Sequence, residues 1–243
     1  MGRSTDKDPA SGGDQAARVR EMFTHIAHRY DLMNSLMTGG QDVRWRQEVI
    51  RRAALLPRAR ILDLGAGTGY LAREALRQQP ACRPVAADFT LKMMQVGKER
   101  TPDSRLDWCG ADALRLPFPD ETFEAIVSGF LLRNVGDLPG ALREQYRVLK
   151  PGGRMVALDT TQPKRTLLTP LINVHLNIVI PHLGRLVTGV REAYVYLPES
   201  TRAFLNAEDL AAEMVAAGFH GVSFRRLMLG TIAIHWGRRK DKG

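Results

Sequence analysis

Cysteine and aromatic residues are scarce in this chain of 243 residues. The two cysteines, Cys82 and Cys109, lie far apart and fit neither a disulfide framework nor the closely spaced pairs of a zinc site. A reducing cytoplasm is therefore the expected compartment. Aromatic residues make up 7% of the chain against 44% for all hydrophobic residues, so aliphatic side chains are expected to form most of the core.

The chain also lacks a hydrophobic run of the roughly 20 residues that are needed to cross a membrane. The most apolar stretch, LINVHLNIVI at 171–180, contains two Asn and one His and is bounded by Pro170 and Pro181. Residues 1–17 are polar and hold no apolar segment of a secretory signal. We expect residues 1–14 to form a disordered tail and residues 15–243 to form a single domain.

Negative charge is in the minority, because 35 Lys and Arg stand against 26 Asp and Glu and the formal net charge is +9. A basic balance suits a nucleic acid or an anionic membrane surface and says nothing about the fold. Part of the excess lies in a C-terminal tail, which is either simply solvated or bound to a partner. Its basic residues are Arg238, Arg239, Lys240 and Lys242.

Strand-like and helix-like segments alternate along most of the chain, which is typical of an α/β fold with a mostly parallel sheet. A helical cap at 15–57 precedes them. Residues 161–206 interrupt the alternation with four prolines, and we expect an insertion that covers the substrate. The segments 222–227 and 231–236 predict an antiparallel edge hairpin around Leu229-Gly230. The other predicted strands are 61–64, 84–87, 106–109, 123–128 and 154–158, and the predicted helices are 71–78, 91–98, 138–149 and 207–217, with a helix stop at Lys150-Pro151-Gly152-Gly153.

A glycine-rich turn, DLGAGTG at 63–69, follows the first of these strands. Gly65, Gly67 and Gly69 permit a tight turn and a close approach of the backbone to a ligand, and the next helix directs free N–H groups toward it. Nicotinamide and flavin sites share this principle. The carboxylate of Asp63, however, would repel a pyrophosphate, whereas it can receive the amino group of a zwitterionic amino acid. The turn therefore predicts S-adenosylmethionine as the cofactor.

Two further acids end the next strands. Asp88 closes the second strand, where a carboxylate can bind ribose hydroxyls. Asp112 follows the third strand and can accept a hydrogen bond from an adenine amino group. Each acid alone could be an ordinary loop or capping residue, but three acids at successive strand ends favour a nucleoside site.

Four segments resemble the ubiquinone/menaquinone biosynthesis C-methyltransferases. They are VREMFTHIAHRYDLMNSLM at 19–37, ILDLGAGTGYLA at 61–72, LPFPDETFEAIVSGFLLRNVGDL at 116–138 and YRVLKPGGRM at 146–155. The resemblance extends from about residue 18 to Lys240 and implies a class I Rossmann-like methyltransferase that methylates a ring carbon of a polyprenylated quinol. The segment LDTTQP at 158–163 is closer to menaquinone-type members, which favours demethylmenaquinol over the benzoquinol of ubiquinone synthesis.

The resemblance also implies particular cofactor contacts. These fall on Thr68, Asp88, Asp112, Ala113 and Ser128, and Tyr30 in the RYD motif is expected to help close the cofactor pocket; capping of a helix is the alternative role for Tyr30. The chain departs from the family in two places. Asp42-Val43 stands where many members have His-Arg, and Leu131 stands where they have a glycine beside the expected active site.

The chemistry requires a base or a positive field, because a phenolic hydroxyl ordinarily titrates near a pKa of ~10. Arg133 is the first candidate, since its guanidinium can stabilise a phenolate or orient a water that takes the proton. The alternative role for Arg133 is a surface ion pair with Asp137. Asn134 is expected to hold a ring oxygen. His182, with His175 in the same segment, is a candidate base that ranks below Arg133, because a histidine in an apolar segment is more often a packed, hydrogen-bonded residue.

Other functions stay open at the level of sequence. One is a methyltransferase for RNA or a small polar acceptor, although no basic-aromatic pattern marks a base-stacking surface and no nucleic acid is expected. Another is a scaffold that binds cofactor or lipid without turnover. No metal motif is present, and the oligomeric state is undetermined. We expect residues 161–206 to admit a prenyl tail from the inner face of an anionic membrane, aided by four flanking basic residues. These are Lys164, Arg165, Arg185 and Arg191.

Overall fold

The computed structural model describes residues 20–101, 103–163, 200–201 and 203–242. The expected tail at 1–14, most of the insertion at 161–206 and its basic flanks therefore lie outside the described residues, as do His175 and His182. Among the described residues, no helix is both long enough and apolar enough to span a membrane.

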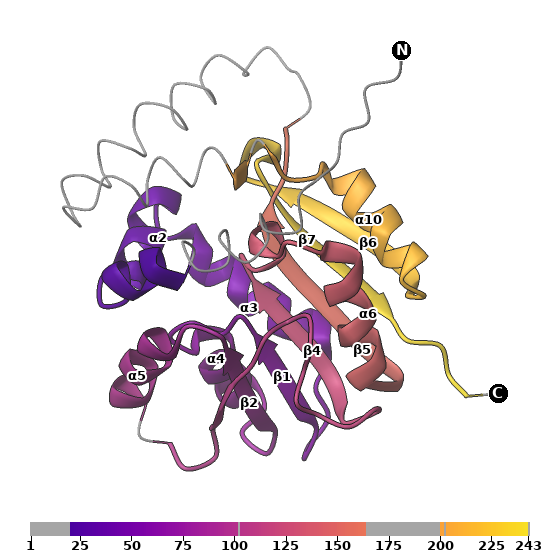
Figure 1. The fold of residues 1–243 in the computed structure, drawn as a ribbon, viewed down its shortest axis with the longest axis horizontal. Helices are drawn as coiled ribbons and strands as arrows, with labels where there is room; N and C mark the ends of the chain where they lie inside the picture. The colour runs from indigo at the N-terminus through magenta and orange to yellow at the C-terminus, as the bar shows by residue number, and fades with distance from the viewer. Residues whose placement is uncertain (1–19, 102, 164–199, 202, 243) are drawn as a thin grey trace, which may run out of the picture.

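Seven strands form one sheet in the order β3-β2-β1-β4-β5-β7-β6 (Figure 1). β1 to β5 are parallel, whereas β7 runs antiparallel to both β5 and β6. This arrangement confirms the predicted Rossmann-like sheet with an antiparallel hairpin at its edge. The strands are β1 (Arg60–Leu64), β2 (Arg83–Asp88), β3 (Asp107–Gly110), β4 (Phe123–Gly129), β5 (Leu149–Thr160), β6 (His220–Leu227) and β7 (Ile232–Arg238).

Helices cover both faces of the sheet and bury a separate apolar cluster on each. On one face, α3 (Gln41–Ala53) and α4 (Tyr70–Gln78) pack on Ile61, Val127 and Val156. On the other face, α6 (Leu138–Val148) and α10 (Ala207–Ala216) pack on Leu62 and Ile126. Figure 1 shows α6 and α10 together on the second face. Consecutive strand residues point to opposite faces of the sheet, so Ile61 and Leu62 contact different pairs of helices.

The N-terminal region is helical, as predicted, but it is interrupted. A helical segment at 20–26 ends in turn residues at 27–29, and α2 (Tyr30–Thr38) begins directly after them. α2 ends at Gly39, which adopts the left-handed conformation that favours glycine. α5 (Leu91–Arg100) follows β2, and its Met93 and Val96 pack against Ala27.

The structure changes the expectation about where the fifth strand begins. The segment Lys150-Pro151-Gly152-Gly153 was predicted as a stop before a strand at 154–158, but β5 begins at once with Leu149. The reason is that the backbone there is paired on both sides: Leu149 pairs with Phe123 of β4, and the N–H of Gly152 donates to the carbonyl of Arg239 at 3.1 Å.

The basic tail is partly neutralised within the fold rather than only solvated. Arg239 forms an ion pair with Glu121 at 3.0 Å and donates to three carbonyl oxygens of 146–149. Lys242 also pairs with Glu121, at 2.7 Å. Arg239 and Lys242 are therefore partly neutralised by Glu121, and their positive charge is not fully available to a partner.

Candidate active site

The glycine turn between β1 and α4 has a backbone that side chains would disturb. Gly65 and Gly69 have φ angles of +67° and +78°, in the left-handed region that favours glycine. A Cβ atom on Gly65 would lie 2.8 Å from the side chain of Leu131, and one on Gly69 would lie 2.6 Å from the ring of Trp108. Glycine is therefore required at both positions by the backbone conformation and by close packing. The turn places the N-terminus of α4 beside the adjoining cavity.

The predicted acids converge on this turn. Asp63, at the end of β1, is 1% exposed and accepts a hydrogen bond from the N–H of Ala72 at 2.9 Å. Burial raises the pKa of Asp63 to about 7. Asp88 accepts from the N–H groups of Gly67 at 2.8 Å and Thr90 at 2.6 Å, and burial also raises the pKa of Asp88. These bonds tie Asp63 to α4, and they tie Asp88 to the glycine turn and to the start of α5.

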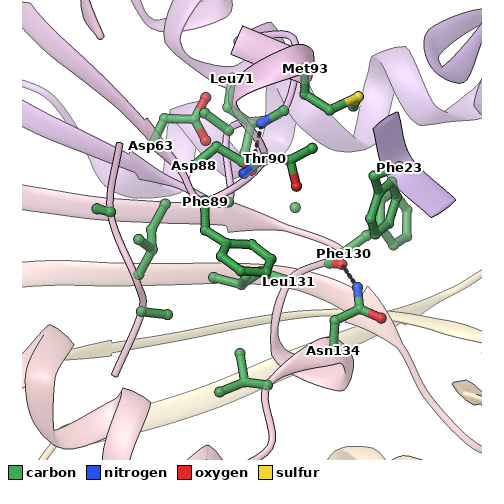
Figure 2. Close-up of a pocket in the computed structure, with 18 of the residues that line it drawn as sticks. Phe23, Asp63, Leu71, Asp88, Phe89, Thr90, Met93, Phe130, Leu131 and Asn134 are labelled. Carbon is green, nitrogen blue, oxygen red and sulfur yellow. Dashed lines mark hydrogen bonds between the residues drawn. The ribbon is translucent and has the colours of Figure 1, made fainter. Parts of the chain in front are cut away.

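A cavity of about 710 Å³ lies in front of these groups (Figure 2). In Figure 2, Asp63 and Asp88 approach it from the sheet, and Asn134 approaches from the segment that follows β4. Apolar side chains make up much of the remaining wall. They include Phe23, Phe89, Met93, Phe130, Leu131 and Val135. The cavity therefore offers a polar side at the strand ends and an apolar wall, as a nucleoside cofactor and an apolar acceptor require.

Most of the predicted cofactor residues border this cavity. Besides the acids at 63, 88 and 112 and the three glycines, the wall includes Tyr30, Thr68 and Ala113. The hydroxyl of Thr68 donates to the carboxylate of Asp31 at 2.8 Å, which ties the glycine turn to α2. Ser128 differs, because it is buried in β4 and is not part of the cavity wall.

Known proteins with similar sequences identify the family. The model of the ubiE/COQ5 methyltransferase family matches residues 12–239. Ubiquinone/menaquinone biosynthesis C-methyltransferase UbiE of Desulfotalea psychrophila is 46% identical over 219 residues, which cover 90% of this chain and 89% of that protein. Demethylmenaquinone methyltransferase of Thermus thermophilus is 43% identical over 220 residues, covering 90% and 100%. The chain belongs to the ubiE/COQ5 methyltransferase family.

Solved structures of lower identity share the fold. The [4+2]-cyclase SpnF superposes with a TM-score of 0.70 at 20% identity, over 93% of this chain and 97% of that one. Phosphoethanolamine N-methyltransferase 2 of Haemonchus contortus, in complex with S-adenosyl-L-methionine, superposes with a TM-score of 0.63 at 15% identity, over 82% and 53%. One of these is a cyclase, so the fold by itself does not define the reaction.

Membership in the family confirms the expected activity. The chain is an S-adenosylmethionine-dependent C-methyltransferase of ubiquinone/menaquinone biosynthesis. The cavity fits this cofactor on structural grounds as well. The glycine cradle leaves no room for a Cβ atom at Gly65 or Gly69, and an acid stands at or next to the end of each of the two strands beside it.

The structure places Arg133 differently from both sequence-based interpretations. Its guanidinium donates to Asp159 of β5 at 2.8 Å, and the two side chains are 5% and 1% exposed. The expected alternative partner, Asp137, instead caps α6 by accepting from the N–H of Gly140 and lies 3.9 Å from Arg143. Arg133 therefore belongs to a buried ion pair behind the cavity wall, and it does not line the cavity.

Asn134 does line the cavity, and its amide donates to the carbonyl of Phe130 at 2.9 Å. Phe130 connects β4 to the short helix η1 (Leu132–Asn134) and adopts a positive φ of 61°, which is rare for an aromatic residue. Its N–H donates to the carbonyl of Leu158 at 2.7 Å. The third predicted catalytic residue, His182, lies outside the described residues.

Sequence reasoning missed Arg46, which α3 directs into the cavity. A signal was available, because residue 46 follows Trp45 and precedes Ile50 by one helical turn on the buried side of the helix. Leu131 was noted only as a departure from the family. In the structure its side chain lies over Gly65, at the wall of the cavity.

Proposed function

We propose that this methyltransferase acts on demethylmenaquinol and that the acids of the cavity orient the cofactor for transfer to a ring carbon. The observation that carries the proposal is a cavity in which the acids at the strand ends face an apolar wall. Two sets of relatives, from Roseiflexus and Thermus thermophilus, are named demethylmenaquinone methyltransferase, which supports the naphthoquinol among the quinols of the pathway.

In this proposal, Asp88 binds the ribose hydroxyls, Asp112 the adenine amino group and Asp63 the amino group of the methionine moiety. When bound, S-adenosylmethionine supplies a methyl group that its sulfonium already activates. The chain's own task is then to align the acceptor carbon and to exclude water from the cavity. Phe130 and Leu131 suit that task, because they form the apolar wall between the glycine turn and Asn134.

Proton removal from the ring hydroxyl is the second task. Asn134 is placed to hold the ring oxygen, and its amide is itself fixed by the carbonyl of Phe130. We assign Arg133 a positioning role: its side chain and its backbone N–H both bind Asp159, which anchors the turn that carries Asn134. His182 stays a candidate base on the sequence alone.

A turnover assay tests the function. Purified protein is incubated with labelled S-adenosylmethionine and a panel of reduced demethylated quinols, and the mass and methyl position of each product are determined. We expect transfer to a ring carbon, with a higher kcat/KM for the naphthoquinol. Methylation of RNA but of no quinol would contradict the proposal, and tight cofactor binding without turnover of any quinol would favour the scaffold interpretation.

We further propose that the enzyme collects its acceptor at an anionic membrane surface. Leu32 and Leu36 support this, because they lie one turn apart on α2 with exposures of 55% and 44%, and α2 also contributes Tyr30 to the cavity. The apolar run at 171–180 and its basic flanks are the sequence-based part of the proposal. Liposome flotation should show binding that rises with anionic lipid and falls when Leu32 and Leu36 become Glu; equal flotation of the variant would contradict it.

A further inference from the structure

Arg46 is a buried cation with an unused hydrogen-bonding edge. Its side chain is 8% exposed, and it lines the same cavity as Asp63. Its Nε atom forms a long ion pair with Asp42, at 3.7 Å, which is beyond hydrogen-bond distance, so this buried Nε has no hydrogen-bond partner. Burying a hydrogen-bond donor without a partner destabilises the folded protein, and the cost is larger when the donor is charged. Asp42 therefore satisfies Arg46 only in part, and because the side chain also borders the cavity, it can meet a ligand there.

The orientation of Arg46 is held from two sides. Its guanidinium lies over the ring of Tyr70, with 4.2 Å between Cζ and the ring centroid, and Tyr70 is the first residue of α4. Asp42 is itself fixed, because it accepts hydrogen bonds from the hydroxyls of Ser35 at 3.1 Å and Thr38 at 3.2 Å. Tyr70 covers one face of the guanidinium and Asp42 lies at its Nε, so the terminal N–H groups are the donors that a ligand can use.

Asp63 lies near Arg46 at the same end of the cavity. The positive charge of Arg46 lowers the pKa of Asp63 and opposes the larger effect of burial. No ion pair joins Arg46 and Asp63 in the described part of the chain, because Arg46 pairs with Asp42 and Asp63 accepts from the N–H of Ala72. One end of the cavity therefore presents an anion and a cation that do not neutralise each other directly. A zwitterionic amino acid, with an ammonium and a carboxylate on one carbon, matches that pair.

We infer that Arg46 binds the α-carboxylate of S-adenosylmethionine while Asp63 receives its α-ammonium. This inference rests on the proposed assignment of the cavity to the cofactor. A guanidinium edge can bind a carboxylate through two parallel N–H donors, which is stronger and more directional than a single bond. Arg46 then discriminates the intact cofactor from adenosyl compounds that lack the carboxylate.

The test compares three ligands by calorimetry. These are S-adenosylmethionine, its decarboxylated form, which keeps the ammonium, and 5′-methylthioadenosine, which has neither group. We expect the wild type to bind the intact cofactor at least tenfold more tightly than the decarboxylated form. In Arg46→Met this ratio should fall to near one, while affinity for 5′-methylthioadenosine is unchanged. Arg44→Met is the matched control, because Arg44 is exposed on the same helix, and it should keep the wild-type ratio.

Each outcome bears on the inference. A wild-type ratio retained in Arg46→Met would overturn it. If that variant does not fold, Arg46→Lys decides, since the point charge without the planar edge should lower the ratio without abolishing it; an unchanged ratio in Arg46→Lys would then overturn the inference. Failure of the proposed cofactor site looks different, because the wild type itself would bind none of the three ligands.

Discussion

Cofactor affinity should fall as the pH is lowered through 7, because in the proposed site Asp63 must be ionised to hold the ammonium group of the cofactor. Asp63 is almost fully buried, and burial raises its pKa to about 7 in the cofactor-free protein. Binding of an ammonium next to the carboxylate favours the charged form and so lowers the pKa of Asp63 in the complex. Below pH 7, the cofactor must therefore displace a proton in order to bind.

The size of the effect follows from the fraction of Asp63 that is ionised. With the pKa at about 7, that fraction is ~76% at pH 7.5 and ~3% at pH 5.5, so the affinity should fall ~25-fold, or ~1.9 kcal/mol. In the cofactor-free protein, the sign of the stability effect is the reverse of the usual one for a carboxyl group. The pKa is higher in the folded state than the ~3.9 of the unfolded chain, so the contribution of Asp63 to stability is lost as the pH rises from about 4 to 7.

Calorimetry between pH 5.5 and 7.5 measures both the affinity and the protons released. The ligand's own α-amino group titrates near ~8, so the range stays below that value. Asp63→Asn should bind weakly and with little dependence on pH. Binding of 5′-methylthioadenosine, which has no ammonium, should also be nearly independent of pH and controls for Asp88. A flat profile for the intact cofactor, or the same slope for 5′-methylthioadenosine, would refute the role of Asp63.

Two further predictions concern the acceptor side. Leu131→Ala should open the cavity wall above Gly65 and raise the ratio of kcat/KM for bicyclic over monocyclic quinols by roughly tenfold. This size is in line with the ~1–3 kcal/mol that a methylene group can contribute to selectivity. An unchanged ratio would show that Leu131 does not shape the acceptor site. Arg133→Met should lower the free energy of unfolding by about 3–5 kcal/mol, because it leaves Asp159 as a buried unpaired charge. Denaturant unfolding should show most of this loss recovered in Arg133→Met/Asp159→Asn, and a single variant as stable as the wild type would rule out the structural importance of the pair.

The sequence predicted the sheet well because alternation of strands and helices leaves few topologies. It also predicted the convergence of Asp63, Asp88 and Asp112, since parallel strands end at the same edge and their following loops must meet there. The start of β5 was not predictable in the same way. Gly152 and Gly153 are helix-stop residues locally, and only pairing with β4 and Arg239 makes them part of a strand.

The position of the Arg46 side chain was harder to predict, because the residues around it come from separate segments of the chain. Tyr70 lies in the next helix, and Asp63 lies in the strand between them. Helical periodicity places residue 46 on the buried side of α3, but it does not say which residues cover that side. The departure from the family at Asp42 has a clear place in the structure, since this carboxylate joins α2 to α3 through the hydroxyls of Ser35 and Thr38.

Arg133 shows why two motifs that are separate in the sequence need to be considered together. Arg133 belongs to the LLRN segment after β4, and Asp159 belongs to the LDTTQP segment that ends β5. The parallel register places Gly129 beside Leu158, which brings the two segments together and allows the buried ion pair. An exchange of either residue alone would leave the other charge buried without a partner. The two segments are therefore expected to constrain each other. In the proposed site, the LDTTQP segment, which favoured a menaquinone-type acceptor, would influence acceptor binding through the turn that carries Asn134.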